Sequence, residues 1–131
     1  MVTTTALYAG ILAIISIVLG FMVGRARGKA KVSLGDGGDK DLLAAIRRHA
    51  NFTEFVPLIV AMLAIIEMNG APKLWIHVLG AAIVFARIAH PIGLSANAGN
   101  PLRAVGAMLT AIITVVCGGI LIWQGIGTLG Q

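Results

Sequence analysis

Two long uncharged runs constrain the fold of this chain more than any other feature of its sequence. Ala6 to Gly24 gives nineteen consecutive residues without a charge, and Ala104 to Gly130 gives twenty-seven. Because a helix needs about 20 apolar residues to cross the hydrocarbon core of a membrane, each run predicts a transmembrane helix. The first run differs from a secretory signal peptide, since basic residues follow it and none precedes it.

Two further spans are predicted in the middle of the chain, where the apolar segments contain ionisable side chains. The uncharged runs there are only twelve and thirteen residues long, which is too short to cross a membrane alone. They reach spanning length when extended from Ala50 to Ile66, which includes Glu54, and from Leu74 to Leu94, which includes Arg87. The sequence therefore predicts four transmembrane helices.

Turn and capping signals separate these spans. A glycine-rich run before Asp39 predicts a loop, and either Asp39 or Asp41 is predicted to cap the helix that follows. Asn69-Gly70 predicts a helix end, and Asn100 before Pro101 predicts a helix start. We predict an all-α polytopic membrane protein with four transmembrane helices per protomer in a left-handed bundle. Its single domain spans residues 1–131, with helices at about 4–26, 39–68, 72–95 and 101–127.

The composition and the placement of charge agree with a membrane protein. Hydrophobic residues make up 58% of the chain and charged residues only 11%, whereas a soluble domain has about 25% charged residues. Seven of the ten Lys and Arg residues lie between Arg25 and Arg48, and only Lys73 falls on the other side of the predicted membrane. By the positive-inside rule, both termini are expected outside the cytoplasm. Basic loops also account for the net charge of +5, so we expect no nucleic-acid partner.

Polar side chains on three predicted helices gather toward the basic side of the membrane. Spacings of three and four residues place those of each helix on one face. A carboxylate at such a depth is costly unless it is paired or faces a wet cavity. The arrangement predicts a pocket for a small, polar, mostly anionic ligand. Its members are Arg47, Asn51 and Glu54 on the second helix, Arg87 and His90 on the third, and Arg103 on the fourth.

Several residues at this end also have a structural interpretation, and His90 taken alone is more typical of a packed, hydrogen-bonded histidine than of a catalyst. Arg47, Arg48 and Arg103 are each consistent with an interfacial anchor. An alternative for Glu54 is an ion pair with Arg87 that joins the second and third helices.

Residues on the other side of the membrane have no clear place in the pocket. Tyr8, Trp75 and Trp123 lie near span ends and are typical of an aromatic belt. His77 lies apart from the cluster, and we interpret it as structural. The single cysteine, Cys117, is about 20 Å along the helix from Arg103, so we predict a packing role for it.

The same residues form a pattern that resembles the signature of the MAPEG family, the membrane-associated proteins in eicosanoid and glutathione metabolism. The segment from Arg47 to Pro57 has the pattern Arg-x-x-x-Asn-x-x-Glu-x-x-Pro. The likeness continues from Phe85 to His90 and from Pro101 to Arg103, and it covers nearly the whole chain. The short chain and the Gly-Asp-Gly-Gly loop are similar to the small bacterial inner-membrane branch.

The resemblance implies a homotrimer that lies among membrane lipids and binds glutathione as a cosubstrate between protomers, near the cytoplasmic face, with no metal. Arg103 matches the arginine that stabilises the glutathione thiolate, since a neighbouring cation lowers the pKa of a thiol. The implied activity is that of a glutathione-dependent transferase or peroxidase-like protein acting on a lipophilic electrophile. By position, the implied glutathione ligands are Arg25, Arg47, Asn51, Glu54, Arg87 and His90.

The chain departs from the catalytic members of the family near the thiol. Leu94 replaces a tyrosine, Ala104 replaces a serine, and Ala50 replaces a second arginine beside the asparagine. The alternative is therefore a noncatalytic membrane scaffold that binds lipid or glutathione. A small multidrug transporter is less favoured, because that hypothesis predicts an acidic residue in the first helix, and the first helix here has none.

Overall fold

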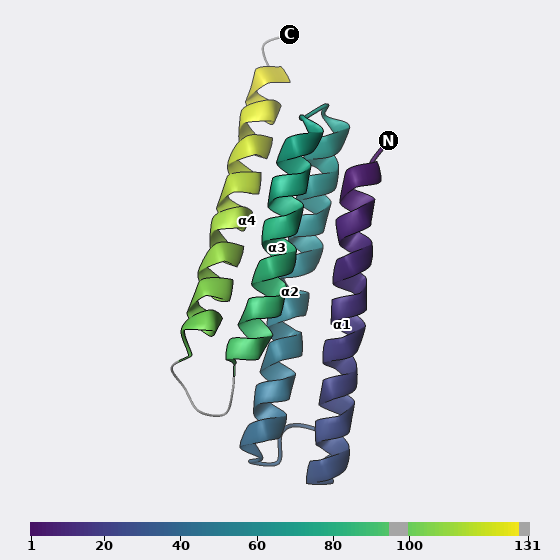
Figure 1. The fold of residues 1–131 in the computed structure, drawn as a ribbon, viewed down its shortest axis with the longest axis vertical. Helices are drawn as coiled ribbons and strands as arrows, with labels where there is room; N and C mark the ends of the chain where they lie inside the picture. The colour runs from purple at the N-terminus through teal and green to yellow at the C-terminus, as the bar shows by residue number, and fades with distance from the viewer. Residues whose placement is uncertain (95–99, 129–131) are drawn as a thin grey trace.

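The computed structural model describes residues 1–94 and 100–128, which form four helices in up-and-down order. They are α1 (Thr3–Ala30), α2 (Lys40–Met68), α3 (Lys73–Gly93) and α4 (Pro101–Thr128). Each helix is long and apolar enough to cross a membrane, which confirms the predicted all-α membrane fold. The start of α1 and the end of α4 lie at one end of the bundle, which we call the opposite end (Figure 1). The α1–α2 loop, the end of α3 and the start of α4 form the basic end.

The helix ends follow the predicted signals closely. The Asp39 side chain accepts a hydrogen bond of 2.8 Å from the Leu42 amide, so Asp39 caps α2 as predicted. Asn100 Oδ1 accepts from the Leu102 amide at 3.0 Å, and Pro101 is the first residue of α4. Between α2 and α3, Gly70 takes a φ of 82°, a left-handed conformation that suits glycine.

Two helix ends differ from the prediction. The first helix continues past residue 26 to Ala30, because Arg27 and Lys29 are good helix formers whose charge suits a helix C-terminus. The third ends at Gly93, because Leu94 is extended. Ser95, the last residue of the predicted third helix, lies outside the described residues, as do the last residues of the uncharged run that ends at Gly130.

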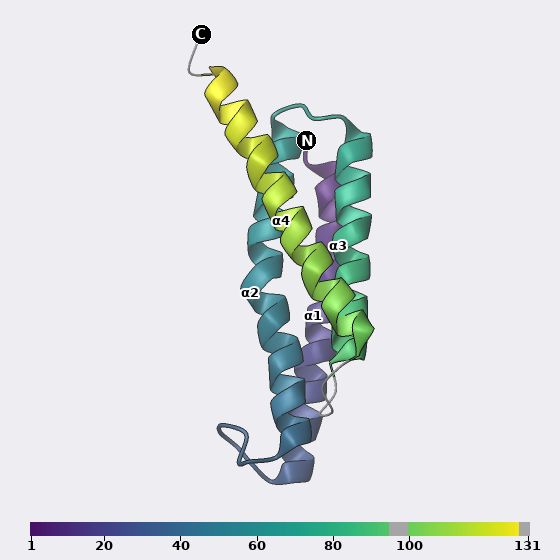
Figure 2. The same cartoon turned by 90° about the vertical axis from the view of Figure 1, so that its left-hand side faces the viewer.

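Glycines set the spacing between helices. A Cβ on Gly106 would lie 2.6 Å from the His90 amide nitrogen, and one on Gly93 would meet the Arg103 backbone. The two glycines therefore bring α4 directly against the end of α3. From there α4 crosses the bundle obliquely toward α2 (Figure 2), and within the described residues it has no contact with α1. On the other side, a Cβ on Gly80 would meet the ring of Tyr8, so α1 lies close to α3.

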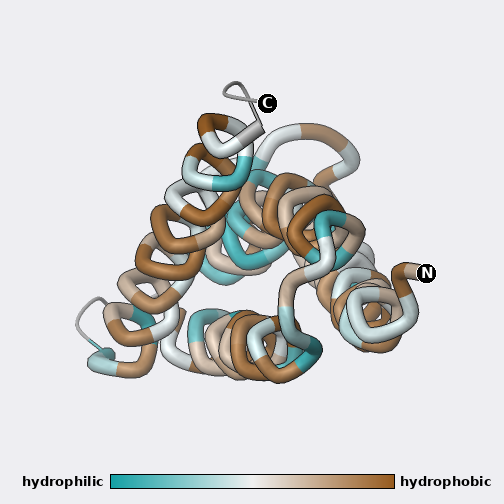
Figure 3. Tube along the Cα trace, turned by 90° about the horizontal axis from the view of Figure 1, so that it is seen from above, coloured by the Kyte–Doolittle hydropathy of each residue, from teal (hydrophilic) through white to brown (hydrophobic). Residues whose placement is uncertain are grey.

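The core and the outer surface are both apolar. Leu12, Ile59, Leu63 and Ile83 are buried between the helices, and Cys117 is fully buried with them, as its predicted packing role requires. Hydrophobic residues also cover outward faces (Figure 3), where many large apolar side chains are exposed. A surface of this kind fits a protein whose solvent is the bilayer.

Candidate functional site

A cavity of about 400 Å³ opens at the basic end between α2, α3 and α4. We call it the basic cavity. Four of the six residues predicted for the pocket line it together, two from α2 and one each from α3 and α4, whereas Glu54 and Arg87 are not among its lining residues. The lining residues are Lys40, Leu43, Ala44, Arg47, Asn51, His90, Leu94 and Arg103.

The fold explains why these four side chains meet. Arg47 and Asn51 are one helical turn apart on α2. His90 lies in the last turn of α3, and Arg103 in the first turn of α4. Because Gly93 and Gly106 have no side chain, the two helix ends approach closely enough to place His90 and Arg103 on one cavity.

Arg87 does not line the basic cavity, but it bonds to Asn51, which does. The Arg87 side chain is only 1% exposed. The Nη1 atom donates to Asn51 twice, to the backbone oxygen at 3.2 Å and to Oδ1 at 3.1 Å. Arg87 therefore orients the Asn51 amide and joins α3 to α2.

Glu54 pairs with Arg47 and has no contact with Arg87 that the structure records. The distance between Arg47 Nη2 and Glu54 Oε1 is 3.6 Å, and each side chain is about half exposed, at 54% and 48%. An exposed pair of this kind contributes about 0–1 kcal/mol. The alternative in which Glu54 pairs with Arg87 is therefore wrong, because Arg87 lies one helical turn away on the Asn51 side.

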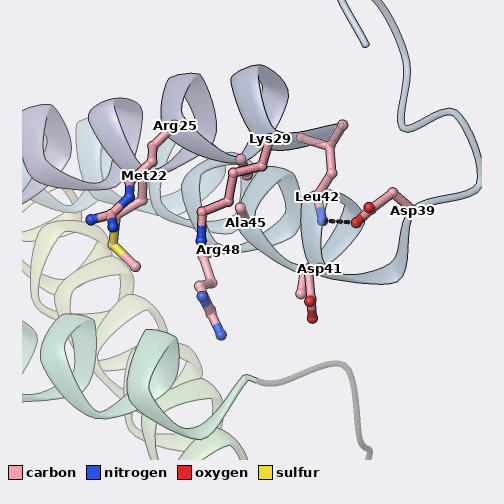
Figure 4. Close-up of a pocket in the computed structure, with 10 residues that line it drawn as sticks. Met22, Arg25, Lys29, Asp39, Asp41, Leu42, Ala45 and Arg48 are labelled. Atoms are coloured by element: carbon pink, nitrogen blue, oxygen red, sulfur yellow. Dashed lines mark hydrogen bonds between the residues drawn. The ribbon is translucent and has the colours of Figure 1, made fainter. Parts of the chain in front are cut away.

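Arg25 lies in a different cavity. It lines a space of about 370 Å³ between α1 and α2, together with Lys29, Asp41 and Arg48 (Figure 4). None of the residues that line the basic cavity belongs to α1. Within one protomer, Arg25 and Arg47 therefore do not share a ligand cavity.

Arg48 joins α2 to the end of α3, a role that its sequence position alone did not predict. Its Nε atom donates a 2.6 Å hydrogen bond to the Leu94 backbone oxygen, just past the end of α3. A cation suits that position, because a helix C-terminus carries partial negative charge. The sequence contained one indication of a separate role. Residues three or four apart share a helix face, whereas adjacent residues do not, so Arg48 does not share the face of Arg47, Asn51 and Glu54.

At the opposite end, polar side chains bond to one another. Glu67, which the sequence analysis did not discuss, accepts hydrogen bonds from the amides of Thr4 at 2.9 Å and Thr5 at 2.8 Å. A carboxylate from α2 thus satisfies free amides at the start of α1. The Tyr8 hydroxyl lies 2.9 Å from His77 Nδ1, which gives His77 the structural role that we predicted.

A larger cavity of about 960 Å³ also lies at the opposite end, and Trp75 and Trp123 line it. Asn69 and Gln124 also line it, and Asn69 Nδ2 donates to Gln124 Oε1 at 2.9 Å, which joins the end of α2 to α4. Among the residues that the structure describes, no charged side chain lines this cavity. It therefore differs in chemistry from the basic cavity.

Comparison with known proteins places these residues in a family. The MAPEG family model matches residues 5–123, a range that contains every predicted site residue. The chain is also 36% identical over 89 residues to the inner membrane protein YecN of Escherichia coli (strain K12), and the match covers 68% of each protein. The same protein from a second Escherichia coli strain matches with equal identity and coverage. This chain therefore belongs to the MAPEG family.

Proposed function

We propose that this protein is a glutathione-dependent membrane transferase or peroxidase-like protein that acts on a lipophilic electrophile. The observation that carries the proposal is the basic cavity, where Arg47, His90 and Arg103 come together from three helices. Its volume of about 400 Å³ lies within the range of small-ligand pockets, roughly 300–1,000 Å³. Membership of the MAPEG family supports glutathione as the ligand.

The lining residues match the charged groups of glutathione. Arg47 and Lys40 supply cations for its carboxylates, and a guanidinium binds a carboxylate through paired hydrogen bonds. Asn51, fixed by Arg87, offers an amide to the peptide groups. Glu54 pairs with Arg47 and is not among the residues that line the cavity, and we propose that it accepts from the ligand's ammonium group.

Arg103 is our candidate catalytic residue. It lies in the first turn of α4, where the positive end of the helix dipole adds to the field of its guanidinium. That field favours the thiolate form of a bound thiol. Within residues 1–94 and 100–128, no hydroxyl-bearing side chain lines the cavity.

The homotrimer is part of the proposal. Arg25 lines a separate cavity on α1 and α2, so it contacts glutathione at the basic cavity only across a boundary between protomers. A site shared by neighbouring protomers gives Arg25 that opportunity. We expect native mass spectrometry in a mild detergent to give the mass of three chains, and a spectrum of monomers and dimers alone would contradict the trimer.

We also propose that the protein lies in a bacterial inner membrane with its basic end in the cytoplasm. The relative YecN is named an inner membrane protein. Nine of the ten Lys and Arg residues belong to the basic end or its loop, and Lys73 alone belongs to the opposite end. The positive-inside rule then places both termini outside the cytoplasm.

A noncatalytic glutathione-binding scaffold is the second candidate. One residue of the cavity lining, Leu94, favours it. Leu94 lines the cavity where catalytic relatives carry a tyrosine. The hydroxyls of Thr53 and Thr110, on the adjoining helices, donate instead to backbone oxygens of their own helices. A scaffold would keep the anion-binding residues and lack a thiolate.

Calorimetry and ultraviolet absorbance of the purified protein in detergent separate the two candidates. We expect glutathione to bind and its thiolate absorbance to appear below the pH at which free glutathione ionises. Arg103→Ala should leave binding largely intact and raise that pH by about one unit, and Arg103→Lys should restore part of the shift. Binding without an early thiolate signal would favour the scaffold, and absence of binding would contradict both candidates.

A further inference from the structure

The first turns of α2 give the basic cavity a wall with a cation at each end. The residues of this wall are Lys40, Leu43, Ala44 and Arg47. The last three follow Lys40 by three, four and seven residues, so all of them lie on one helix face. Lys40 and Arg47 are about 10 Å apart along the helix axis, and the two side chains between them are apolar. Such a wall is complementary to a ligand with an uncharged middle and an anionic group at each end.

Lys40 has its charge available, because the acids beside it in the sequence are engaged elsewhere. Asp39 caps α2 through its 2.8 Å hydrogen bond from the Leu42 amide. Both Asp39 and Asp41 line the separate cavity that contains Arg25 (Figure 4). Among the described residues, the structure records no ion pair for Lys40, and its side chain is exposed. A ligand carboxylate at Lys40 therefore displaces no internal partner.

The Arg47 end of the wall combines a cation with an acid. Arg47 Nη2 lies 3.6 Å from Glu54 Oε1, so Glu54 is held beside a residue that lines the cavity without lining it itself. The γ-glutamyl end of glutathione carries a carboxylate and an ammonium on one carbon, which complements this pair. The glycine end carries a carboxylate alone, and no acid lines the cavity beside Lys40 in the part of the chain that the structure describes. The two ends of the wall therefore differ in the same way as the two ends of glutathione.

We propose that Lys40 is a specificity-determining residue that binds the glycine carboxylate of glutathione, while Arg47 and Glu54 bind its γ-glutamyl end. This assignment rests on the proposed function, since it gives glutathione an orientation in the basic cavity. The cysteine of the ligand then lies along Leu43 and faces Arg103, which lines the cavity from α4. The cavity selects thiols with an anionic group at both ends and discriminates against thiols that lack the second carboxylate.

Calorimetry of the full chain in detergent with two matched ligands tests the proposal. Glutathione is compared with its glycine monoethyl ester, which keeps the γ-glutamyl end and the thiol but lacks the second carboxylate. We expect the wild type to bind glutathione about tenfold more tightly than the ester, the difference that one charge-assisted hydrogen bond makes. In Lys40→Ala, both ligands should bind with the weaker affinity of the ester.

Three further variants show whether the preference belongs to Lys40. Lys40→Arg keeps the positive charge and should keep the preference for glutathione. Lys29→Ala removes a lysine from the cavity that contains Arg25 and should also keep it. Arg47→Ala should weaken both ligands by a similar factor, because they share the γ-glutamyl end. Circular dichroism of each variant confirms that the helices are intact.

The wild type and Lys40→Ala together separate this assignment from the proposed function. An unchanged preference in Lys40→Ala would overturn the role of Lys40 and leave glutathione binding intact, and so would equal binding of the two ligands by the wild type. Loss of the preference in Lys29→Ala would show that the general charge of the basic end attracts the carboxylate instead. Failure of the wild type to bind either ligand would contradict the proposed function and, with it, the orientation.

Discussion

At the opposite end of the bundle, polar side chains find their partners within the chain: Glu67 with the amides of Thr4 and Thr5, and Tyr8 with His77. At the basic end, cations from α2 and α4 line an open cavity. The one ion pair recorded among the described residues, Arg47 with Glu54, is half exposed and 3.6 Å long. At the opposite end, polar groups of the four helices therefore bond to one another. At the basic end, they line a cavity where a ligand can contact them.

This difference indicates that polar groups at the opposite end contribute to stability and that those at the basic end contribute to ligand binding. A polar group that bonds to a neighbouring helix lowers the free energy of the folded protein, whereas a cation left on a cavity is available to a ligand. Substitutions of polar side chains at the opposite end should therefore change stability and spare binding, and substitutions of the polar side chains that line the basic cavity should do the reverse. Four measurements test that division.

The largest effect is expected for Arg47→Ala. Losing a charge-assisted hydrogen bond should weaken glutathione binding by about 1.5–3 kcal/mol, roughly 10- to 150-fold. Lys73→Ala is the control, since it removes the same charge from the opposite end and should leave affinity unchanged. Isothermal titration calorimetry in detergent measures both. Unchanged affinity in Arg47→Ala would mean that Arg47 is only an interfacial anchor.

Gly93→Ala tests whether helix packing builds the basic cavity. The added Cβ would meet the Arg103 backbone, so α3 and α4 must separate at a cost of about 1–3 kcal/mol. Glutathione affinity should fall as well, because Arg103 moves relative to His90. Gly118→Ala, where a Cβ would meet nothing within 4 Å, is the control for thermal unfolding followed by circular dichroism. Equal unfolding midpoints would contradict the packing argument.

Glu67→Ala and Glu54→Ala compare two glutamates of the same helix. Glu67 satisfies two amides at the start of α1, and its loss should cost about 1–2 kcal/mol, as for other helix caps. Glu54 forms only an exposed pair, so its loss should cost about 0–1 kcal/mol in the absence of glutathione. Thermal unfolding without ligand measures both. A larger loss for Glu54 would reverse the assignment of the two ends.

The smallest effect is expected for Tyr8→Phe. The substitution keeps the ring against Gly80 and removes the hydroxyl that bonds to His77, which should cost about 0.5–1.5 kcal/mol. Trp123→Phe, at a side chain that is 69% exposed, should change stability by less than about 0.5 kcal/mol. Chemical or thermal unfolding distinguishes them, and glutathione affinity should stay the same in both.

The sequence by itself determined the spans, their order and two of the helix starts. Hydrocarbon excludes charge, so the uncharged runs located the helices. Asp39 and Asn100 located two helix starts, because their side chains bond to amides only two or three residues away. The convergence of Arg47, Asn51, His90 and Arg103 on one cavity was also predictable, because helices in up-and-down order bring residues of similar depth to one end.

The tertiary structure alone decided which side chains meet at that depth. Arg25 and Arg47 lie at the same end but on different cavities, and Arg87 turns to Asn51 and not to Glu54. Likewise, nothing near Glu67 in the sequence shows that its partners are sixty residues earlier, at Thr4 and Thr5. The physical reason is that these helices are apolar on the outside as well as the inside. Hydrophobic pattern therefore does not fix the rotation of each helix, and close approaches at Gly80, Gly93 and Gly106 do.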